Sequence, residues 1–438
     1  MLNINYEKDI DTLLHRLYPI TRSITGNGNR ETLKILQEYI PLEIKEYPTG
    51  QEVYDWTIPK EWNITDAWIK NSKDEKIVDF QKSNLHIVSY STPIHTKLKW
   101  SELKNHLHYL ENLPEAIPYR TSYYNETWGF CLNYNDYKKY FTDENEEFEI
   151  FIDSKLENGS LSIGELLIEG KSKKEYLLSS YICHPSMLND SMSGVIASTL
   201  IAKELLKNKE NLEHSYRIVF VPETIGAIAY CANNEKAMKG IKNGLVLTTC
   251  GGLGQYGYKQ SWQKENFINE MIEDVFEENN IDFITYPFDI HGSDERQYSS
   301  QGFKINCATI SKDRYYEYKE YHTSLDNLHF VKAENLNKTV DLYLQLISKM
   351  DKNIIYKNLQ PNCEVMLSKH DLYPKTGGAI LPNSTLSVLD LILWSLFYMD
   401  GKTTLYEIAK KLDVDLEVLY KEALKIEEKN IIKKVMNE

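Results

Sequence analysis

Two histidines and an aspartate have the residue types and surroundings of metal ligands. His184 follows the apolar run LLSSYIC, and Asp190 comes six residues later, just before small residues that predict a helix start. His322 lies in a polar loop between Tyr321 and Thr323. Two imidazoles and a carboxylate suit Zn²⁺ and leave one coordination position open. Taken singly, Asp190 is as readily a helix cap and His322 a solvated loop residue, so the prediction depends on the set.

A further acid, Glu223, ends the next β-rich run, RIVFVPETIG. Beside a metal-activated water it can take a proton and pass it to a leaving amine, as amide hydrolysis requires. Alone, it would be interpreted as a helix cap or a surface acid. In the segment GSDER, Asp294 could orient a ligand histidine and Glu295 could hold a substrate amine. Arg296 and Arg22 could bind an anionic group, although a structural ion pair is the commoner role of an arginine.

The elements that must position these residues alternate between strands and helices. The runs LLSSYIC, YRIVFVPE and GLVLTTC are apolar and β-branched, and the stretches between them have helical periodicity. This alternation predicts an α/β fold with a mostly parallel, mixed sheet flanked by helices. Ligands of such sheets gather beyond the carboxyl ends of the strands, where His184 and Glu223 fall.

The pattern of apolar runs, turn residues and helical periodicity along the chain predicts three domains. Residues 1–47 and 165–352 are expected to form the α/β domain, and residues 48–164, with short β-rich runs between turns, an inserted all-β domain. Residues 360–438 carry three successive helical patterns and a final apolar run, which is typical of a winged helix.

The order of the motifs resembles that of the zinc aminopeptidase family, which includes bacterial leucyl aminopeptidases and, as relatives, the glutaminyl cyclases. The matching segments are NDSMSG, ETIG, GSDERQYSSQG and YHTSLDN. The resemblance implies that His184 binds one metal, that Asp190 bridges two, and that His322 binds the other. Glu223 would be the general base.

The chain departs from this family where a second metal would find its acids. Thr224 follows the base where two-metal members have an acid, and the next strand end reads LTTCGG, with Thr248, Thr249 and Cys250 in place of an aspartate. The remaining three ligands are enough for one catalytic zinc. We therefore expect one Zn²⁺ per chain, with two as the alternative.

Nearly the whole chain is similar to a group of bacterial proteins that combine an aminopeptidase-like domain, an inserted β domain and a carboxyl-terminal winged helix. The shared segments are RSITGNG, YDWTIPKEWN, IPYRTSYYNETWGF, YICHPSMLND and FVPETIG. Proteins of this group are often linked with surface polysaccharide genes, so the resemblance implies a polysaccharide context for the substrate.

Charge and composition exclude several partners. A formal charge of -14 disfavours nucleic acid and anionic membranes. The helical pattern DLEVLYKEALKIEEKN, which would read DNA in a winged helix, holds five acids and would repel phosphate. No apolar run is long enough to span a bilayer, and the acidic start lacks the pattern of a signal peptide, so we expect a cytoplasmic protein with reduced cysteines. The winged helix or the β domain is then a candidate for homo-oligomer contacts.

Three functions follow from these residues. The first is a zinc-dependent hydrolase of the aminopeptidase type that acts on a short peptide or an aminoacylated small molecule. The second is an inactive aminopeptidase-like binding or scaffold protein. The absence of acids at Thr224 and in the segment LTTCGG favours this interpretation. The third is a ligand-sensing transcriptional regulator, which would require DNA binding that the acidic helix opposes.

Overall fold

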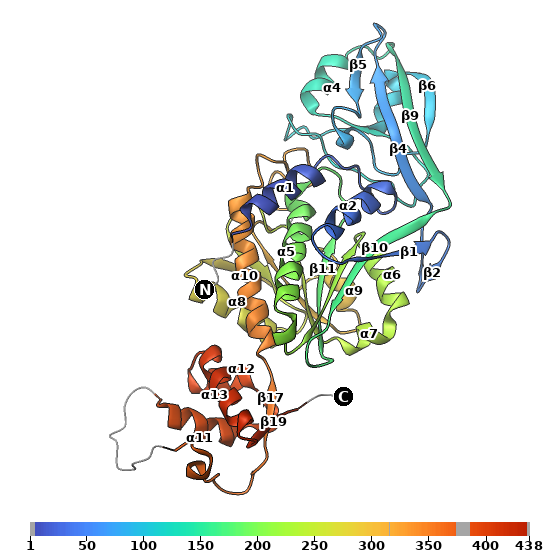
Figure 1. Ribbon diagram of the computed structural model, residues 1–438. Coiled ribbons are helices and arrows are strands. Elements are labelled where there is room, and N and C mark those ends of the chain that lie inside the picture. Colours follow the sequence, from blue (N-terminus) through green and yellow to red (C-terminus); the bar gives the residue numbers. More distant parts are fainter. Residues whose placement is uncertain (1–4, 315, 374–385, 436–438) are drawn as a thin grey trace. The chain divides into compact units, whose positions relative to one another are not determined.

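The computed structural model describes residues 5–314, 316–373 and 386–435 (Figure 1). Contacts divide the chain into two compact units. The first unit comprises Met1–Ile168, Glu175–Lys209 and Tyr216–Tyr343. The second comprises Glu169–Lys174, Glu210–Ser215 and Leu344–Glu438. Among the described residues, no helix is both long and apolar enough to cross a bilayer.

An eight-stranded mixed sheet forms the centre of the first unit, with the strand order β1-β10-β12-β11-β13-β16-β14-β15. Its strands are β1 (Glu43–Pro48), β10 (Ser160–Ile168), β11 (Glu175–Tyr181), β12 (Ser215–Val221), β13 (Asn243–Val246), β14 (Tyr256–Lys259), β15 (Phe283–Tyr286) and β16 (Asn306–Ser311). Strands β11, β13 and β16 are parallel, whereas β1, β10 and β12 pair antiparallel. The predicted α/β fold with a mixed sheet is confirmed.

Helices cover this sheet. They are α1 (Glu7–Leu17), α2 (Asn27–Gln37), α5 (Gly194–Lys207), α6 (Ile225–Asn233), α7 (Glu235–Gly240), α8 (Phe267–Glu278), α9 (Glu295–Tyr298) and α10 (Ala333–Asp351). Helix α5 packs on β11, α6 on β10 and α8 on β16. Helix α5 begins with Gly194 because a Cβ atom there would overlap the carbonyl oxygen of Leu247. This close approach brings the start of α5 against the end of a neighbouring strand.

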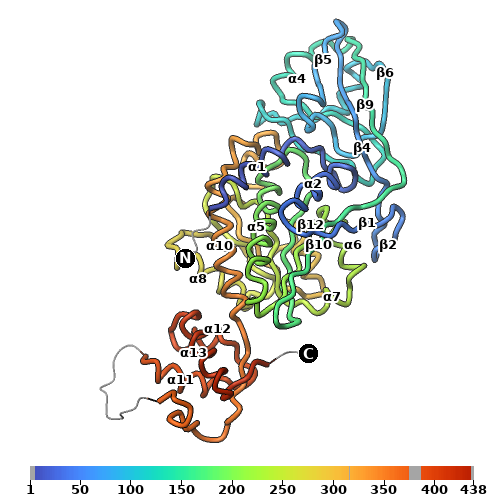
Figure 2. The backbone as a smooth tube through the Cα atoms, in the orientation of Figure 1, coloured from blue at the N-terminus to red at the C-terminus, as the bar shows by residue number. Residues whose placement is uncertain are grey.

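A second sheet lies within the first unit, in the stretch between β1 and β10 that can be followed in Figure 2. It has the order β5-β4-β9-β6, with β4 (Glu61–Lys70), β5 (Lys76–Asp79), β6 (Ile94–Lys99) and β9 (Glu147–Glu157). Burial alternates along β9, as expected for a sheet with one packed face. Shorter elements complete it: the hairpin β2 (Glu52–Val53) and β3 (Trp56–Thr57), β7 (Leu107–His108), β8 (Phe130–Cys131), α3 (Trp100–Leu103) and α4 (Tyr134–Tyr140). The expected domain boundaries remain predictions.

The second unit contains the three helices that the sequence predicts near the end of the chain. They are α11 (Val388–Tyr398), α12 (Leu405–Leu412) and α13 (Leu416–Glu428), packed with a three-stranded sheet of β17 (Ile355–Asn358), β18 (Asp400–Thr404) and β19 (Ile432–Lys434). Ser387 and Thr404 form capping boxes, and Asp415 caps α13, which explains where each helix begins. The predicted winged helix is confirmed.

Candidate metal centre

The three predicted metal ligands, His184, Asp190 and His322, lie together. One ligand atom of each falls within 4.8 Å of the others, and His322 Nε2 is 3.0 Å from Asp190 Oδ2. The side chains of His184 and Asp190 are 3% and 2% exposed, whereas that of His322 is 31% exposed, so the cluster is reached from the His322 side. Two imidazoles and one carboxylate, largely removed from water, fit a zinc ion by number and type of donor.

Each ligand comes from a different part of the first unit. His184 follows the end of β11, Asp190 lies in the turn Leu188–Ser193 that leads into α5, and His322 lies in the loop between β16 and α10. Arg22 supports the backbone of His184 through a hydrogen bond. Its buried guanidinium donates from Nε to the carbonyl oxygen of His184 at 2.9 Å and from Nη1 to that of Leu17 at 2.6 Å. Arg22 is therefore a backbone support in this structure, not an exposed anion ligand.

Asp326 holds the Asp190 turn in place. Its buried carboxylate accepts three backbone N–H groups of that turn, from Leu188, Asn189 and Asp190, at 3.2, 2.6 and 2.9 Å. Burial raises the pKa of Asp326 to about 7. In the sequence this residue is only the last letter of the motif YHTSLD, and no local signal gives it this role.

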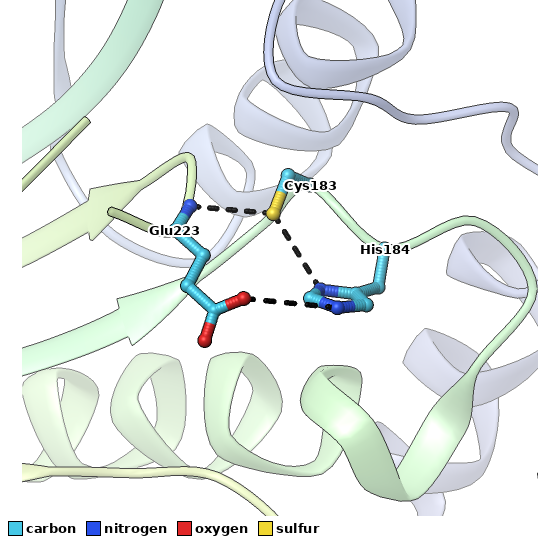
Figure 3. Close-up of side chains that lie close together, drawn as sticks. All are labelled: Cys183, His184 and Glu223. Carbon is cyan, nitrogen blue, oxygen red and sulfur yellow. Dashed lines mark hydrogen bonds and ion pairs between the residues drawn. The ribbon is translucent and has the colours of Figure 1, made fainter. Parts of the chain in front are cut away.

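Glu223 lies beside His184 and Cys183 (Figure 3). Its Oε2 is 3.8 Å from His184 Nε2, and its backbone N–H donates to Cys183 Sγ at 3.2 Å. Cys183 Sγ is also 3.5 Å from His184 Nδ1. The sequence predictions treat the cysteines only as reduced thiols, and the position of Cys183 directly before His184 is the signal that could have placed it at the site.

The pKa values of three central groups, His184, Asp190 and Glu223, are shifted, the first two downward and the third upward. Burial lowers the pKa of His184 to about 4, which keeps the imidazole neutral, as a metal ligand requires. Burial opposes ionisation of Asp190, but His184 and His322 outweigh it and lower the pKa of this carboxyl to about 2. Burial, followed by the charges of Asp294 and Asp190, raises the pKa of Glu223 well above its ordinary range. The ligand set thus holds a carboxylate, while Glu223 is poised to hold a proton.

The second carboxylate oxygen of Asp190, Oδ1, is hydrogen-bonded to a hydroxyl group. The Tyr181 hydroxyl donates to Asp190 Oδ1 and lies 2.7 Å from Thr248 Oγ1. One oxygen of Asp190 therefore faces His322 and the other is taken by a phenol. This arrangement fits one metal better than two.

The other predicted residues are distributed around Glu223. Asp294 accepts the backbone N–H of Thr224 at 2.7 Å and contacts no imidazole of the ligand set in the described structure, where its Oδ2 has no hydrogen-bond partner. Burial raises the pKa of Asp294 to about 7. Arg296 lies 3.4 Å from the Thr224 hydroxyl, so it is close to the site. Glu295 instead is buried and forms an ion pair with Lys259 at 3.1 Å.

Aromatic rings flank the two histidines. Tyr321 stacks on His322 with ring centroids 4.0 Å apart. Tyr119, from the inserted stretch, lies 5.2 Å from the ring of His184 and 5.3 Å from that of His322. Its backbone N–H also donates to the carbonyl oxygen of His322 at 2.8 Å. The inserted stretch thus supports the His322 loop, which sequence periodicity alone could not reveal.

Backbone strain gathers at the same place. Thr224, Thr249, Ser186 and His322 have φ angles of 63°, 44°, 44° and 52°, in the left-handed region that non-glycine residues rarely adopt. Such conformations persist where the surrounding structure imposes them, and they are common at functional sites.

Comparisons with known proteins agree with this fold. Residues 11–353 match a family described as a domain of unknown function, DUF4910, and residues 354–434 match a winged helix-turn-helix family. A Clostridium acetobutylicum protein, provisionally named a polysaccharide biosynthesis protein with an aminopeptidase-like domain, is 43% identical over 404 residues, 92% of this chain and 91% of the relative.

Solved structures are similar as well. The crystal structure of a provisionally named peptidase from Clostridium acetobutylicum has a TM-score of 0.85 and 40% identity, over 98% of this chain and 96% of that one. A zinc aminopeptidase from Bacillus subtilis has a TM-score of 0.56 and 13% identity, over 78% of this chain and 94% of that one, which shows a shared fold. The predicted resemblance to zinc aminopeptidases is confirmed for the fold.

Proposed function

The chain belongs to the DUF4910 family, and from this premise we propose that it is a zinc-dependent hydrolase of amide or peptide bonds, of the aminopeptidase type. One observation carries the proposal: His184, Asp190 and His322, separated by up to 138 residues in the chain, converge within 4.8 Å beside Glu223. The aminopeptidase-like fold supports the same reaction class.

In this proposal His184, Asp190 and His322 hold one zinc ion. The ion supplies Lewis acidity, which polarises the scissile carbonyl group and lowers the pKa of water. Glu223 takes the proton of the attacking water at its carboxylate and passes it to the leaving amine. Its raised pKa makes the carboxylate a stronger proton acceptor than an ordinary glutamate.

The substrate is a short peptide or an aminoacylated small molecule that serves polysaccharide biosynthesis. The name of the Clostridium acetobutylicum relative supports the polysaccharide context. Arg296, beside the Thr224 hydroxyl, is placed to bind an anionic group of such a substrate.

The test is the metal content of purified wild type, His184→Ala and His322→Ala, measured by elemental mass spectrometry after zinc reconstitution. We expect about one zinc per chain in the wild type and loss of zinc in both variants. His329→Ala is the matched control, because His329 is exposed and lies outside the ligand cluster.

Hydrolysis of a panel of aminoacyl p-nitroanilides and short peptides by the zinc-loaded protein completes the test. A folded wild type that takes up no zinc would overturn the proposal. Stoichiometric zinc without hydrolysis of any amide would instead favour the binding or scaffold protein.

A further inference from the structure

Two aromatic side chains of the first unit face water together. Trp56 and Tyr124, which we name the aromatic strip, are 39% and 51% exposed. The rings of Trp56 and Tyr124 meet edge to face, with centroids 5.7 Å apart. Exposed aromatic groups that gather in one place commonly mark a binding surface.

The aromatic strip is connected to the metal centre through the neighbour of Tyr124. The hydroxyl of Tyr123 lies 2.8 Å from that of Tyr119, whose ring lies 5.2 Å from His184. Tyr123 is thus linked to the site, while the next residue contacts Trp56. One short stretch of the chain therefore leads from the ligand cluster to the exposed rings.

The backbone that presents the aromatic strip is held firmly. Tyr54 and Tyr123 have φ angles of 58° and 37°, which are costly for bulky residues. The Tyr54 hydroxyl donates to Glu235 at 3.1 Å, and the Gln51 amide donates to Asn233 at 2.9 Å. These bonds fasten the β2–β3 hairpin to the region of α6 and α7, and α6 starts two residues after Glu223.

We infer that the aromatic strip binds the sugar rings of the substrate, and that the aminoacylated molecule of the proposed function is a short oligosaccharide whose amino sugar carries the amide bond to be cleaved. This inference rests on the proposed function, because it assigns the amide to the metal centre. Sugar rings present apolar C–H faces that stack on Trp and Tyr, and their hydroxyl groups suit a polar border.

Tyr and Trp favour such a role because they offer a large contact area at a low cost in conformational entropy. A peptide side chain would instead require an enclosed apolar pocket, whereas the rings of Trp56 and Tyr124 are open to solvent. The exposed rings therefore favour a flat, stacking ligand.

The experiment is calorimetric titration with triacetylchitotriose, an oligosaccharide of N-acetylated amino sugars. Wild type and Trp56→Ala/Tyr124→Ala are compared, each zinc-loaded and metal-free. We expect millimolar or tighter binding to the wild type and about tenfold weaker binding to the double variant, since tenfold corresponds to about 1.4 kcal/mol. Trp394→Ala is the matched control, because Trp394 is 41% exposed on α11 of the other unit.

The outcomes separate this inference from the proposed function. Absence of binding to the wild type, or equal binding to the folded double variant, overturns the glycan site whatever the hydrolytic activity. Weaker binding to the double variant in the metal-free protein supports the site even if no amide is hydrolysed. Trp56→Phe should restore most of the affinity, because it keeps a stacking ring, and circular dichroism checks that every variant is folded.

Discussion

Two buried acids at the candidate metal centre differ in their partners from a buried acid of the second unit. In the first unit, no lysine or arginine forms an ion pair with Glu223 or Asp294 within the described residues, and both pKa values are raised. In the second unit, Glu213 accepts hydrogen bonds from Lys171 and Lys434, at 2.9 and 2.7 Å. Burial opposes ionisation of Glu213, but these lysines outweigh it and lower the pKa. A buried acid without an ion pair keeps a raised pKa, as groups that transfer protons often do, whereas a paired acid stabilises the fold.

Helix α13 of the winged helix contributes further contacts of the second kind. In α13, Tyr420 donates to Glu213 at 3.1 Å, and Glu417 forms an ion pair with Lys352. These side chains of the helix that would read DNA are engaged within their own unit, which agrees with its acidic sequence. We continue to expect no nucleic acid partner.

The largest effect should come from Glu223→Gln, which removes the proposed general base, an acid that forms no ion pair with a lysine or arginine of the described structure. We expect the rate of amide hydrolysis to fall by about 10²- to 10⁴-fold, because a positioned general base contributes that much. Zinc content should not change, and exposed Glu265→Gln should keep full activity. A fully active, zinc-loaded Glu223→Gln variant would show that Glu223 is not the general base.

Asp326→Ala should cause the largest loss of stability. Three backbone N–H groups of the Asp190 turn would lose their acceptor, at a cost of about 3 kcal/mol or more in the free energy of unfolding. Urea denaturation of the metal-free protein measures this loss, and zinc affinity should fall as well. Asp326→Asn keeps one acceptor oxygen, so its free energy of unfolding should lie between those of the wild type and Asp326→Ala. An Asp326→Ala variant as stable as the wild type would contradict the role of Asp326.

Glu213→Gln should lower the free energy of unfolding by about 1 to 2 kcal/mol, because the hydrogen bonds from charged lysines are lost or weakened. Zinc content and hydrolysis should stay unchanged. The folded-state pKa of Glu213 lies below its ordinary value of 4.5, so its stabilisation is present above that pH and is lost as the pH falls through the folded-state pKa. The difference between variant and wild type should therefore shrink in acid. An effect on hydrolysis would show that the paired acid also serves the chemistry.

The smallest effect is expected from Asp294→Asn. The charge of Asp294 helps to raise the pKa of Glu223, so its removal should move the acid limb of the pH profile of kcat/KM to lower pH. Asn can still accept the Thr224 N–H. Exposed Asp282→Asn is the control, and a profile that is unchanged or moves to higher pH would show that Asp294 does not act on the base.

Sequence patterns predicted the main strands and helices and the residues that converge at the candidate metal centre. Apolar runs predicted the strands that precede His184 and Glu223, helical periodicity and caps predicted the three helices of the winged helix, and motif order predicted the ligand set. These signals are local, because periodicity and capping act within a few turns or one strand.

The support of the site became visible from the folded structure alone. That structure placed Asp326 under the Asp190 turn, the Tyr181 hydroxyl on Asp190 and Tyr119 beside His322. Asp294, which the sequence predicted to orient a ligand histidine, instead accepts the backbone N–H of Thr224. Most of these contacts join residues far apart in the chain, 136 positions for Asp190 and Asp326, and they depend on strand order and loop packing. Residue type and spacing carry no record of such pairings, because many distant groups could serve each donor equally well.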